Sequence, residues 1–341
     1  MTVHGFLLGK FMPPHAGHLL CAQVGRARVD VMTVLVCSHD AEAIDGYLRA
    51  DLMRSCLPER GFRVIHMHRD IPQAPEDHPD FWPIWRAAIA EHHPEPIDWV
   101  FGSDTYIHRL AQEVGARAFP VDPDRRVVPV SGTAIRSDPA AHWSYVPGPV
   151  RPLYQKRLTM LGAESTGKTT LSEDLAARTG TVPIPEYGRD YDALYRHGQA
   201  WIASDFEAIM AGHNALASCM AERSGPLIVE DTDEVQTLVW AEALTGEAPD
   251  QLVACARAAS CGKRYVLLGH DLPWIDDGTR HFPDPERRAW FTQKLAHWLD
   301  AFDADWVAVE GPDRAAAVHA EFDALSARSA PNIPRHGRPS D

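Results

Sequence analysis

Two kinds of hydrophobic pattern alternate along the first third of the chain. Short apolar runs, typical of buried strands, take turns with longer segments in which apolar residues recur at helical spacing. We predict strands at residues 3–9, 30–38, 63–68, 98–103 and 116–121. We predict helices at residues 17–28, 46–57, 81–92 and 105–114. This alternation predicts a parallel sheet with right-handed crossovers. Ligands of such sheets bind beyond the carboxyl ends of the strands.

A proline-rich stretch separates this alternation from a second one. Residues 145–152 read YVPGPVRP and hold three prolines, which favours a linker over a helix or a central strand. Beyond it we predict strands at residues 157–162, 182–186, 226–231, 264–271 and 305–311. We predict helices at residues 168–179, 199–223, 286–301 and 314–327. We therefore expect domains at residues 1–146 and 156–327, a linker at 147–155 and a disordered tail at 328–341.

The composition fits two globular domains and narrows the classes of function. The 341-residue chain is 45% hydrophobic, which is enough for a core in each half. Its net charge of −14 argues against a broad surface for nucleic acid. Six scattered cysteines without a C-x-x-C pair indicate neither a zinc site nor disulfides. No signal peptide or long apolar run is evident, so we expect a cytoplasmic protein without membrane contact.

The stretch LGAESTGKTTL (161–171) carries phosphate-binding chemistry. It matches the P-loop pattern G-x4-G-K-[ST], and it lies between a predicted strand and a predicted helix as that pattern requires. In such a loop, backbone N–H groups surround phosphate oxygens, the lysine reaches the β- and γ-phosphates, and the threonine hydroxyl binds Mg²⁺. We expect ATP to contact Gly162, Glu164, Ser165, Thr166, Gly167, Lys168, Thr169 and Thr170, with Thr169 as a ligand of Mg²⁺.

Carboxylates near the ends of two further predicted strands favour a small-molecule kinase among the P-loop proteins. LIVEDTD places Glu230, Asp231 and Asp233 where a carboxylate can meet Mg²⁺ or its water shell, and we expect Asp231 to be a ligand of the ion. PEYGRDY supplies Glu186, followed by Arg189, and a kinase needs a carboxylate to orient and deprotonate the acceptor hydroxyl. Glu186 could instead stabilise a helix N-terminus. Asp190, Asp231 and Asp233 stay open as alternatives for the base.

A loop of mixed charge, HDLPWIDDGTRHFPDPERR (270–288), precedes a predicted helix. It has the character of a lid that could bring Arg280, Arg287 or Arg288 to the transferring phosphoryl group. Each of these arginines could equally be a solvated surface residue. We expect the acceptor site and the lid to include Glu186, Arg189, Asp231, Asp233, Asp271, Trp274 and Arg280.

The stretch GKFMPPHAGH (9–18) directly follows the first predicted strand. His15 and His18 are three residues apart at the start of a helix, so their side chains share a face. They could bind a metal ion, although no neighbouring carboxylate or cysteine completes such a site. They could instead donate hydrogen bonds to phosphate oxygens at the helix N-terminus. Gly9 would allow the backbone to approach a ligand closely.

Two motifs in the first domain resemble those of the nucleotidylyltransferase superfamily. GKFMPPHAGH resembles G-x-F-x-P-x-H-x-G-H, and VSGTAIR (130–136) resembles [IV]-S-x-T-x-x-R, which follows about one domain later. Together with the P-loop, VFGSDTY, PEYGRDY, EDTD and DLPWIDDGTR, they resemble the bifunctional nicotinamide-nucleotide adenylyltransferase / ribosylnicotinamide kinase family over roughly residues 3–325. The resemblance implies two α/β domains with parallel sheets, a Rossmann-like nucleotidylyltransferase domain followed by a P-loop kinase domain.

The resemblance also implies two reactions. The second domain would phosphorylate nicotinamide riboside with ATP to give nicotinamide mononucleotide (NMN), and the first would transfer AMP from ATP to NMN, giving NAD⁺ and pyrophosphate. In the first domain ATP would contact Gly9, Lys10, Phe11, His15, His18, Ser131, Thr133 and Arg136. NMN would contact Trp82, Trp85, Gly102 and Asp104. The catalytic residues of the two domains would be His18, Arg136, Lys168, Glu186 and Asp231. The cofactor would be Mg²⁺.

Several alternatives remain beside this interpretation. Trp82 and Trp85 could stack on a pyridinium ring, or they could be core residues one helical turn apart. The same architecture could act on another riboside and nucleotide pair, or it could sense nucleotides with little turnover. Many family members begin with a helix-turn-helix domain. Here the first predicted strand starts near Val3, so we expect no DNA binding. A homo-oligomer stays open.

Overall fold

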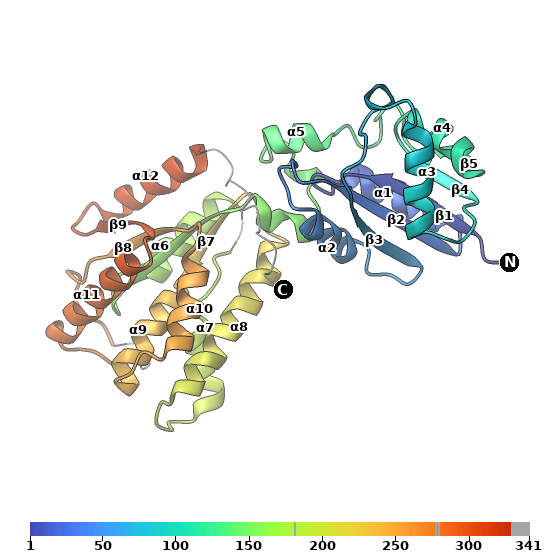
Figure 1. The fold of residues 1–341 in the computed structure, drawn as a ribbon. Coiled ribbons are helices and arrows are strands. Elements are labelled where there is room, and N and C mark those ends of the chain that lie inside the picture. The colour runs from blue at the N-terminus through green and yellow to red at the C-terminus, as the bar shows by residue number, and fades with distance from the viewer. Residues whose placement is uncertain (181, 277, 279, 329–341) are drawn as a thin grey trace. The chain divides into compact units, whose positions relative to one another are not determined.

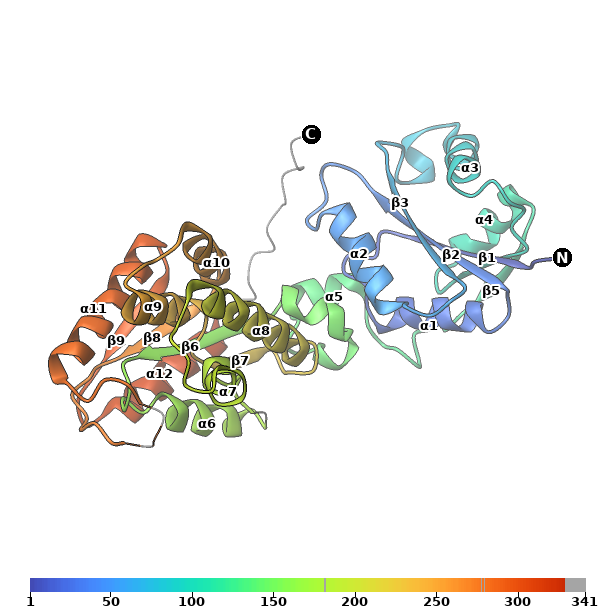
Figure 2. The same cartoon turned by 90° about the horizontal axis from the view of Figure 1, so that it is seen from below.

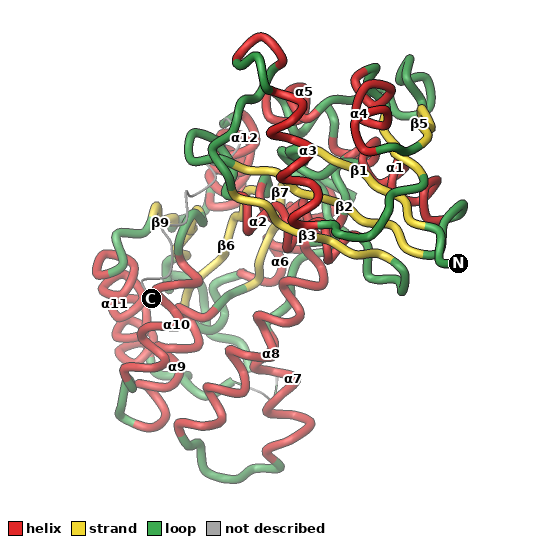
Figure 3. The backbone as a smooth tube through the Cα atoms, turned by 45° about the vertical axis from the view of Figure 1, so that its right-hand side comes forward, coloured by secondary structure: helices red, strands yellow, loops and turns green. Residues whose placement is uncertain are grey.

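A computed structural model describes residues 1–180, 182–276, 278 and 280–328. The chain divides into two compact units, the first made of residues 1–154 and the second beginning at residue 155 (Figure 1). Both units are built from a parallel sheet with helices on its two faces, and Figure 3 shows the strands of each sheet lying between helices. The predicted α/β class is therefore confirmed for both halves.

Five parallel strands form the sheet of the first unit in the order β3-β2-β1-β4-β5. The strands are β1 (His4–Gly9), β2 (Val31–Ser38), β3 (Phe62–His68), β4 (Trp99–Gly102) and β5 (Arg117–Pro120). The strand order reverses between β1 and β4, which is where a sheet of this type opens a crevice at its carboxyl edge. The GKFMPPHAGH motif begins at the end of β1 and therefore lies at that crevice.

Helices cover both faces of this sheet (Figure 2). They are α1 (Ala16–Arg26), α2 (Gly46–Cys56), α3 (Phe81–His92), α4 (Tyr106–Val114) and the short α5 (Gly132–Ser137). Apolar residues of α1 and α2 pack on one face, around Met32 and Val34, and those of α3 and α4 on the other, around Phe6 and Leu35. Alternation along β1 and β2 thus fills two separate cores, as expected for a doubly covered sheet.

Residues 147–155, expected to be a linker, are more ordered than their prolines suggest. A 3₁₀ helix, η3 (Gly148–Leu153), buries Val150 and contacts α2 within the first unit. Shorter 3₁₀ turns are η1 (Pro75–Asp77) and η2 (Trp143–Tyr145). Of the tail expected at 328–341, residues 329–341 lie outside the described residues, and Arg328 forms an ion pair with Asp305.

Four parallel strands form the second sheet in the order β7-β6-β8-β9. They are β6 (Lys156–Gly162), β7 (Leu227–Asp231), β8 (Arg264–Leu268) and β9 (Asp305–Val309). The helices are α6 (Lys168–Arg178), α7 (Tyr187–Tyr191), α8 (Ala203–Ala221), α9 (Glu234–Thr245), α10 (Asp250–Ser260), α11 (Pro285–Ala301) and α12 (Arg314–Ala327). The P-loop connects β6 to α6, as its pattern requires.

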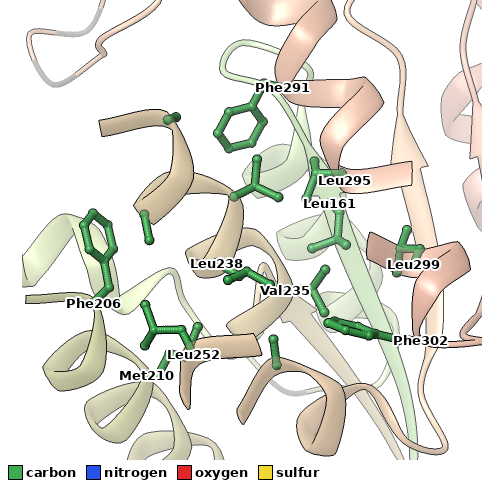
Figure 4. Packing of buried hydrophobic residues seen from close by; sticks show 14 of the residues in the cluster. Leu161, Phe206, Met210, Val235, Leu238, Leu252, Phe291, Leu295, Leu299 and Phe302 are labelled. Carbon is green, nitrogen blue, oxygen red and sulfur yellow. The ribbon is translucent and has the colours of Figure 1, made fainter. Parts of the chain in front are cut away.

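The larger core of the second unit lies under α8, α9, α10 and α11. Figure 4 shows Leu238 and Val235 of α9 at its centre, with Phe206 of α8 and Phe291 of α11 around them. Helices α6 and α12 cover the opposite face through a second cluster that includes Leu175 and Phe322. The P-loop and the ends of β6 and β7 are therefore held between two packed layers.

Two predicted elements of the second unit differ from the structure, and two helices of this unit were not predicted. Residues 182–186 were expected to be a strand, but Ile184 alone forms an isolated parallel bridge, with Glu230. The helix expected at 199–223 begins at Ala203, and α7 with a π-helical turn, η4 (Asp192–Arg196), precedes it. Helices α9 and α10 were not predicted. Seven residues of α9 are buried, so it lacks the one-sided apolar stripe by which a surface helix is recognised.

Candidate active sites

The first candidate site is a cavity of about 630 Å³ in the first unit. It lies where β1 and β4 end, and its lining includes all twelve residues predicted for ATP and NMN in this half of the chain. They are Gly9, Lys10, Phe11, His15, His18, Trp82, Trp85, Gly102, Asp104, Ser131, Thr133 and Arg136. Its volume is within the usual range of small-molecule sites. Residues more than a hundred positions apart in the sequence therefore face one space.

His15 and His18 form a stacked pair at the start of α1. Their ring centroids are 3.6 Å apart. Nδ1 of His15 accepts a hydrogen bond from the Gly17 N–H at 3.2 Å, and Nδ1 of His18 accepts one from the His15 N–H at 3.3 Å. Because each Nδ1 is an acceptor, the proton of each neutral ring is on Nε2. The two rings therefore offer two Nε2–H donors, as phosphate oxygens require.

Both imidazoles are held in the neutral form. Burial, together with the nearby charge of Arg125, lowers the pKa of His15 to about 4. Burial, and then the charge of the neighbouring His15, lowers the pKa of His18 well below its usual value. Phe11 packs edge-on against His18 with centroids 4.8 Å apart. The pair therefore offers hydrogen-bond donors to an anion, and no net charge of its own.

Arg136 ties the two motifs of this site together. Its guanidinium donates to the Met12 carbonyl and, at 3.2 Å, to the Thr133 hydroxyl. Ser131 caps α5 by accepting the Ala134 N–H at 3.1 Å. A Cβ on Gly132 would lie 2.7 Å from the Met12 carbonyl oxygen, so only glycine lets the two segments approach this closely. The first and second motifs therefore form one wall of the cavity.

Lys10 is held at the edge of the cavity by a carboxylate. Its Nζ lies 3.2 Å from Oε1 of Glu42, which also pairs with the fully buried Arg49. Arg49 donates to the carbonyls of Lys10 and Cys37 and so connects the start of the loop after β1 to the end of β2. Sequence reasoning missed Arg49, because a single arginine in a helix of mixed composition gives no signal.

The expected NMN residues have unequal environments. Trp85 is 8% exposed and donates from Nε1 to the Pro72 carbonyl at 2.9 Å, so it belongs partly to the core, as its alternative interpretation held. Trp82 is only partly buried, and the Arg109 guanidinium lies 5.5 Å from its ring centroid. Asp104 lies 3.5 Å from the Arg125 guanidinium.

Arg125 also lines this cavity, and sequence reasoning missed it as well. The Asp122 carboxylate accepts the backbone N–H groups of Arg126, Val127 and Val128, which folds the loop so that Arg125 has a φ of 51°. One signal in the sequence could have indicated this loop. It is an aspartate that is followed by a polar turn shortly before the second motif.

The second candidate site begins at the P-loop. Gly162 has φ 153° and Gly167 has φ 91°, so the loop uses backbone conformations that favour glycine. Lys168 is buried, and its Nζ donates to the carbonyls of Gly162 and Ala163 at 2.8 and 2.9 Å. Burial lowers the pKa of Lys168, while the carboxylates of Glu186 and Asp231 act in the opposite direction. The lysine thus lies against the loop that is expected to surround the phosphates.

Thr169 and Asp231 meet at the end of the P-loop. The Thr169 hydroxyl donates to Oδ2 of Asp231 at 2.6 Å. Oδ1 of Asp231 is buried and has no hydrogen-bond partner among the described residues. Burial raises the pKa of Asp231, and the charge of Glu186 raises it further. A free carboxylate oxygen beside a hydroxyl fits a hard cation such as Mg²⁺.

Such a cation would need ligands beyond these two. For the part of the chain that the structure describes, no group of three or more His, Cys, Asp or Glu side chains is arranged to hold a metal ion. Mg²⁺ in phosphoryl-transfer sites is commonly bound by one or two carboxylates together with substrate phosphates and water. Thr169 and Asp231 suit that mode of binding, in which the nucleotide completes the coordination.

Beside the P-loop lies a cavity of about 380 Å³. Five of the predicted residues line it, namely Glu164, Lys168, Glu186, Arg189 and Arg280. Oε2 of Glu186 accepts a hydrogen bond from Nε of Arg189 at 2.7 Å. Other parts of the wall lie outside the sequence motifs, among them Trp201, Phe206, His213, Gln236 and Trp240. A flat, partly aromatic space thus adjoins the phosphate loop.

Asp233 does not face this cavity. It is 1% exposed and caps α9 by accepting the Val235 N–H at 2.9 Å, while its other oxygen accepts from Lys263 at 3.0 Å and from the Tyr265 hydroxyl at 2.6 Å. The structure therefore gives Asp233 a role in the interior rather than in the acceptor site. Its acidic neighbourhood in EDTD could not reveal this, because the partners come from another strand.

The expected lid is attached to the P-loop through Glu164 and Ser165. The Glu164 carboxylate accepts the backbone N–H groups of His281 and Phe282, both at 2.8 Å. The Ser165 hydroxyl accepts from the Ile275 N–H at 3.0 Å and from Arg280. These contacts involve residues that were expected to touch ATP, so the P-loop holds the loop that follows β8.

The other residues predicted near the lid support the loop. Trp274 lies 3.5 Å from the Glu164 carboxylate through its Nε1. Asp271 pairs with Arg314, whose guanidinium donates to the Thr166 carbonyl at 2.8 Å. Arg288 is 4% exposed and donates to the Glu164 and Leu272 carbonyls at 3.1 and 3.0 Å, so it is a buried support rather than a solvated arginine.

Six of the eight P-loop residues predicted to contact ATP are not part of the cavity lining, namely Gly162, Ser165, Thr166, Gly167, Thr169 and Thr170. Thr166 is buried and donates to the Ala163 carbonyl at 2.9 Å, which stabilises the loop from within. Thr170 is exposed on α6, and Thr169 faces Asp231.

Among the described residues no helix has the length and apolar character of a membrane span.

Comparisons with known proteins match part of the chain to a domain family and most of its length to whole proteins. Residues 157–315 match the family model of an AAA domain. The trifunctional NAD biosynthesis/regulator protein NadR of Salmonella typhimurium strain LT2 is 27% identical over 328 residues, covering 91% of this chain and 79% of that protein. NadR of Escherichia coli K12 is 28% identical over the same shares.

Solved structures of NadR have the same fold as this chain. A NadR crystal structure in complex with NR superposes with a TM-score of 0.71 at 21% identity, covering 96% of this chain and 98% of the other. A NadR structure in complex with NAD and AMP-PNP gives 0.69 at 21% identity, covering 99% of both. With sequence likeness over 91% of its length, this chain is a homologue of NadR.

Proposed function

We propose that this chain is a transferase of NAD biosynthesis with two ATP-dependent activities. The second unit would phosphorylate nicotinamide riboside to NMN, and the first would adenylylate NMN to NAD⁺. The observation that supports the proposal is that one chain contains two candidate phosphate-binding sites, the stacked histidine pair with Arg136 and the P-loop with Thr169 and Asp231. The names of the relatives agree with it, since they describe NAD biosynthesis, and a solved NadR binds NR.

In the kinase unit, backbone N–H groups of the P-loop and Lys168 would hold the phosphates of ATP. Glu186 would accept the proton of the riboside 5′-hydroxyl. It lines the cavity, whereas Asp231 is bonded to Thr169 and Asp233 is in the interior. Mg²⁺, held by Thr169, Asp231 and the phosphates, would neutralise charge on the transferring group. The riboside would occupy the 380 Å³ cavity beside the loop.

In the adenylyltransferase unit, the phosphate of NMN would attack the α-phosphorus of ATP, and pyrophosphate would leave. No protein nucleophile is needed, so catalysis depends on position and charge. His15 and His18 would donate Nε2–H hydrogen bonds to phosphate oxygens, and Arg136 would stabilise the charge that develops on the leaving group. Trp82 and Asp104 would contact the mononucleotide at the other side of the cavity.

The test is to incubate the purified chain with nicotinamide riboside, ATP and Mg²⁺ and to follow NMN and NAD⁺ by chromatography. Lys168→Ala should stop before NMN yet convert supplied NMN to NAD⁺. His18→Ala should accumulate NMN, because its kinase site is intact. A wild-type chain that consumes neither riboside nor NMN would overturn the assignment of substrates.

Other ribosides, run in the same assay, decide whether the architecture serves a different substrate pair. A chain that binds these ligands with scarcely any turnover would indicate a nucleotide sensor instead. The cytoplasmic location, the oligomeric state and the absence of DNA binding stay predictions from the sequence.

A further inference from the structure

A threonine directly after β7 has a backbone conformation that its side chain disfavours. Thr232 has a φ of 72°, in the left-handed region where a β-branched residue is an outlier. Strained residues of this kind gather at binding and catalytic sites, because only the surrounding structure can hold them in place. Thr232 also lines the second cavity. The strain therefore occurs where the proposed function requires a ligand to bind.

The chain on both sides of Thr232 holds it in this conformation. The Asp231 N–H donates to the Ile184 carbonyl at 2.8 Å, and the Thr232 N–H donates to the Met160 carbonyl at 3.1 Å. On the other side, the Asp233 carboxylate caps α9 and is bonded in the interior. Because both flanking segments are fixed, the chain turns sharply at Thr232 and presents this residue to the cavity.

The hydroxyl of Thr232 is available to a ligand. It makes no hydrogen bond with any of the described residues, and its oxygen is not one of their fully buried unpaired atoms, so it is open to the cavity. A second threonine, Thr237, lines the same cavity, but its hydroxyl donates to the Asp233 carbonyl at 3.1 Å. Of the two hydroxyls, that of Thr232 is the one without a partner in the chain.

Helix α9 indicates which part of an acceptor would reach Thr232. Thr232 directly precedes the N-cap of this helix. In the first turn, Oε1 of Gln236 accepts the Gly162 N–H at 3.1 Å, so this end of the helix lies next to the P-loop. Trp240, one turn farther along, also lines the cavity. The accepting hydroxyl must come to the P-loop, so the sugar that carries it lies near Thr232 and the base lies toward Trp240.

The chemistry of Thr232 also fits a sugar better than a phosphate. The charge of the phosphates would be met by Lys168 and by backbone N–H groups of the P-loop. A threonine hydroxyl is neutral and can both donate and accept, as a sugar hydroxyl can. We propose that Thr232 is a specificity-determining residue whose hydroxyl binds a secondary hydroxyl of the acceptor's sugar. The inference rests on the proposed kinase function and refines it.

The test compares nicotinamide riboside with its 2′-deoxy and 3′-deoxy analogues at saturating ATP, with release of ADP as the readout. Wild type should have a KM about tenfold higher for at least one analogue, because the Thr232 hydroxyl then lacks its partner. Thr232→Val keeps the shape of the side chain and removes the hydroxyl. It should raise the KM for nicotinamide riboside about tenfold, with kcat almost unchanged, and leave the KM for that analogue as it was. Thr232→Ser should keep the preference.

Two further variants separate the loss of the hydroxyl from a change in the backbone or in packing. Thr232→Gly removes the hydroxyl and adopts a φ of 72° without strain, so it should have the same effect on KM as Thr232→Val. Thr237→Val removes a hydroxyl that is already bonded within α9 and should behave as wild type. Thermal unfolding of each variant reports on folding. If Thr232→Val does not fold, Thr232→Gly and Thr232→Ser decide.

The outcomes separate the inference from the proposed function. If wild type phosphorylates none of the three ribosides, the kinase assignment fails. If wild type phosphorylates all three with equal KM, Thr232 does not bind the sugar and the inference is wrong. The same holds if folded Thr232→Val and Thr232→Gly change the KM of all three ribosides in parallel, or if they raise the KM for ATP instead.

Discussion

Asp231 and Glu230 are adjacent at the end of β7, yet their carboxylates have opposite environments. Glu230 is bonded to Lys263, Arg157 and the Thr159 hydroxyl. Burial by itself would raise the pKa of Glu230, but the two cations outweigh it and hold the pKa at about 2. Asp231 has a raised pKa and one free oxygen. The Glu230 carboxylate therefore stabilises the fold. The buried carboxylate of Asp231 lowers the stability of the fold instead, and a bound cation would offset this cost.

This contrast predicts two different phenotypes from two similar substitutions. Asp231→Asn should lower kinase turnover at least about 100-fold without lowering the melting temperature of the chain, because it removes a buried charge with a raised pKa. Glu230→Gln should lower the free energy of unfolding by about 3 kcal/mol, because Lys263 loses a buried partner. Thermal unfolding and a riboside kinase assay at several Mg²⁺ concentrations check both. A destabilised but active Asp231→Asn would contradict the magnesium assignment.

Motif residues could be placed from the sequence, and their neighbours could not. The positions of the Lys168 and His18 side chains follow from the local sequence, because a P-loop fixes the first and a helix start fixes the second. Asp233 is acidic and close to Asp231, but in the interior it is bonded to Lys263, which directly precedes β8, and to Tyr265 of β8. His213 belongs to no motif, and its place in the cavity depends on how α8 packs. Contacts between distant segments decide such positions.

At the scale of elements, the P-loop and the loop after β8 are joined by side chains that a nucleotide would also contact. Glu164 accepts two backbone N–H groups from His281 and Phe282. Its carboxylate is thus engaged in charge-assisted hydrogen bonds, which are stronger than neutral ones. The position of this loop should therefore depend on one P-loop side chain.

Glu164→Ala should release the segment around Arg280. We expect trypsin to cleave after Arg280 about tenfold faster in this variant, because local opening no longer breaks two hydrogen bonds to a carboxylate. The KM for ATP should rise as well. Glu173→Ala, which removes an exposed carboxylate on α6, is the matched control and should behave as wild type. Equal cleavage rates in wild type and Glu164→Ala would show that the carboxylate does not hold the loop.

Elements with strong local patterns were predicted well, and those that depend on burial were not. The five strands of the first sheet follow apolar runs that are covered on both faces. Helix α9 was missed because its buried residues surround it, so the sequence around Val235 and Leu238 shows no polar face. The strand expected at 182–186 reduces to a bridge at Ile184, because the prolines on both sides of it, Pro183 and Pro185, cannot donate to a ladder.

At the scale of the whole molecule, acid should affect the two units at different pH. His15 has a folded pKa of about 4, below its usual 6.5, because burial disfavours the imidazolium. Its contribution to stability is complete above pH 6.5 and is lost as the pH falls toward 4, since the unfolded chain binds the proton first. His18 acts in the same direction. Glu230, with a folded pKa of about 2 against 4.5, weakens the second unit only below pH 4.5.

The first unit should therefore lose about 2 kcal/mol of stability between pH 6.5 and 5 from His15 alone, while Glu230 still stabilises the second unit fully. Amide hydrogen exchange read by mass spectrometry separates the units, because peptides from β1 and β2 report on the first and peptides from β6 and β8 on the second. Protection of the first unit should fall in this interval and that of the second should persist. His15→Asn keeps an acceptor for the Gly17 N–H but cannot titrate, so its first unit should lose less protection than wild type over the same range. If the variant and wild type lose protection equally, the neutral, buried state of His15 is not what makes the first unit sensitive to acid.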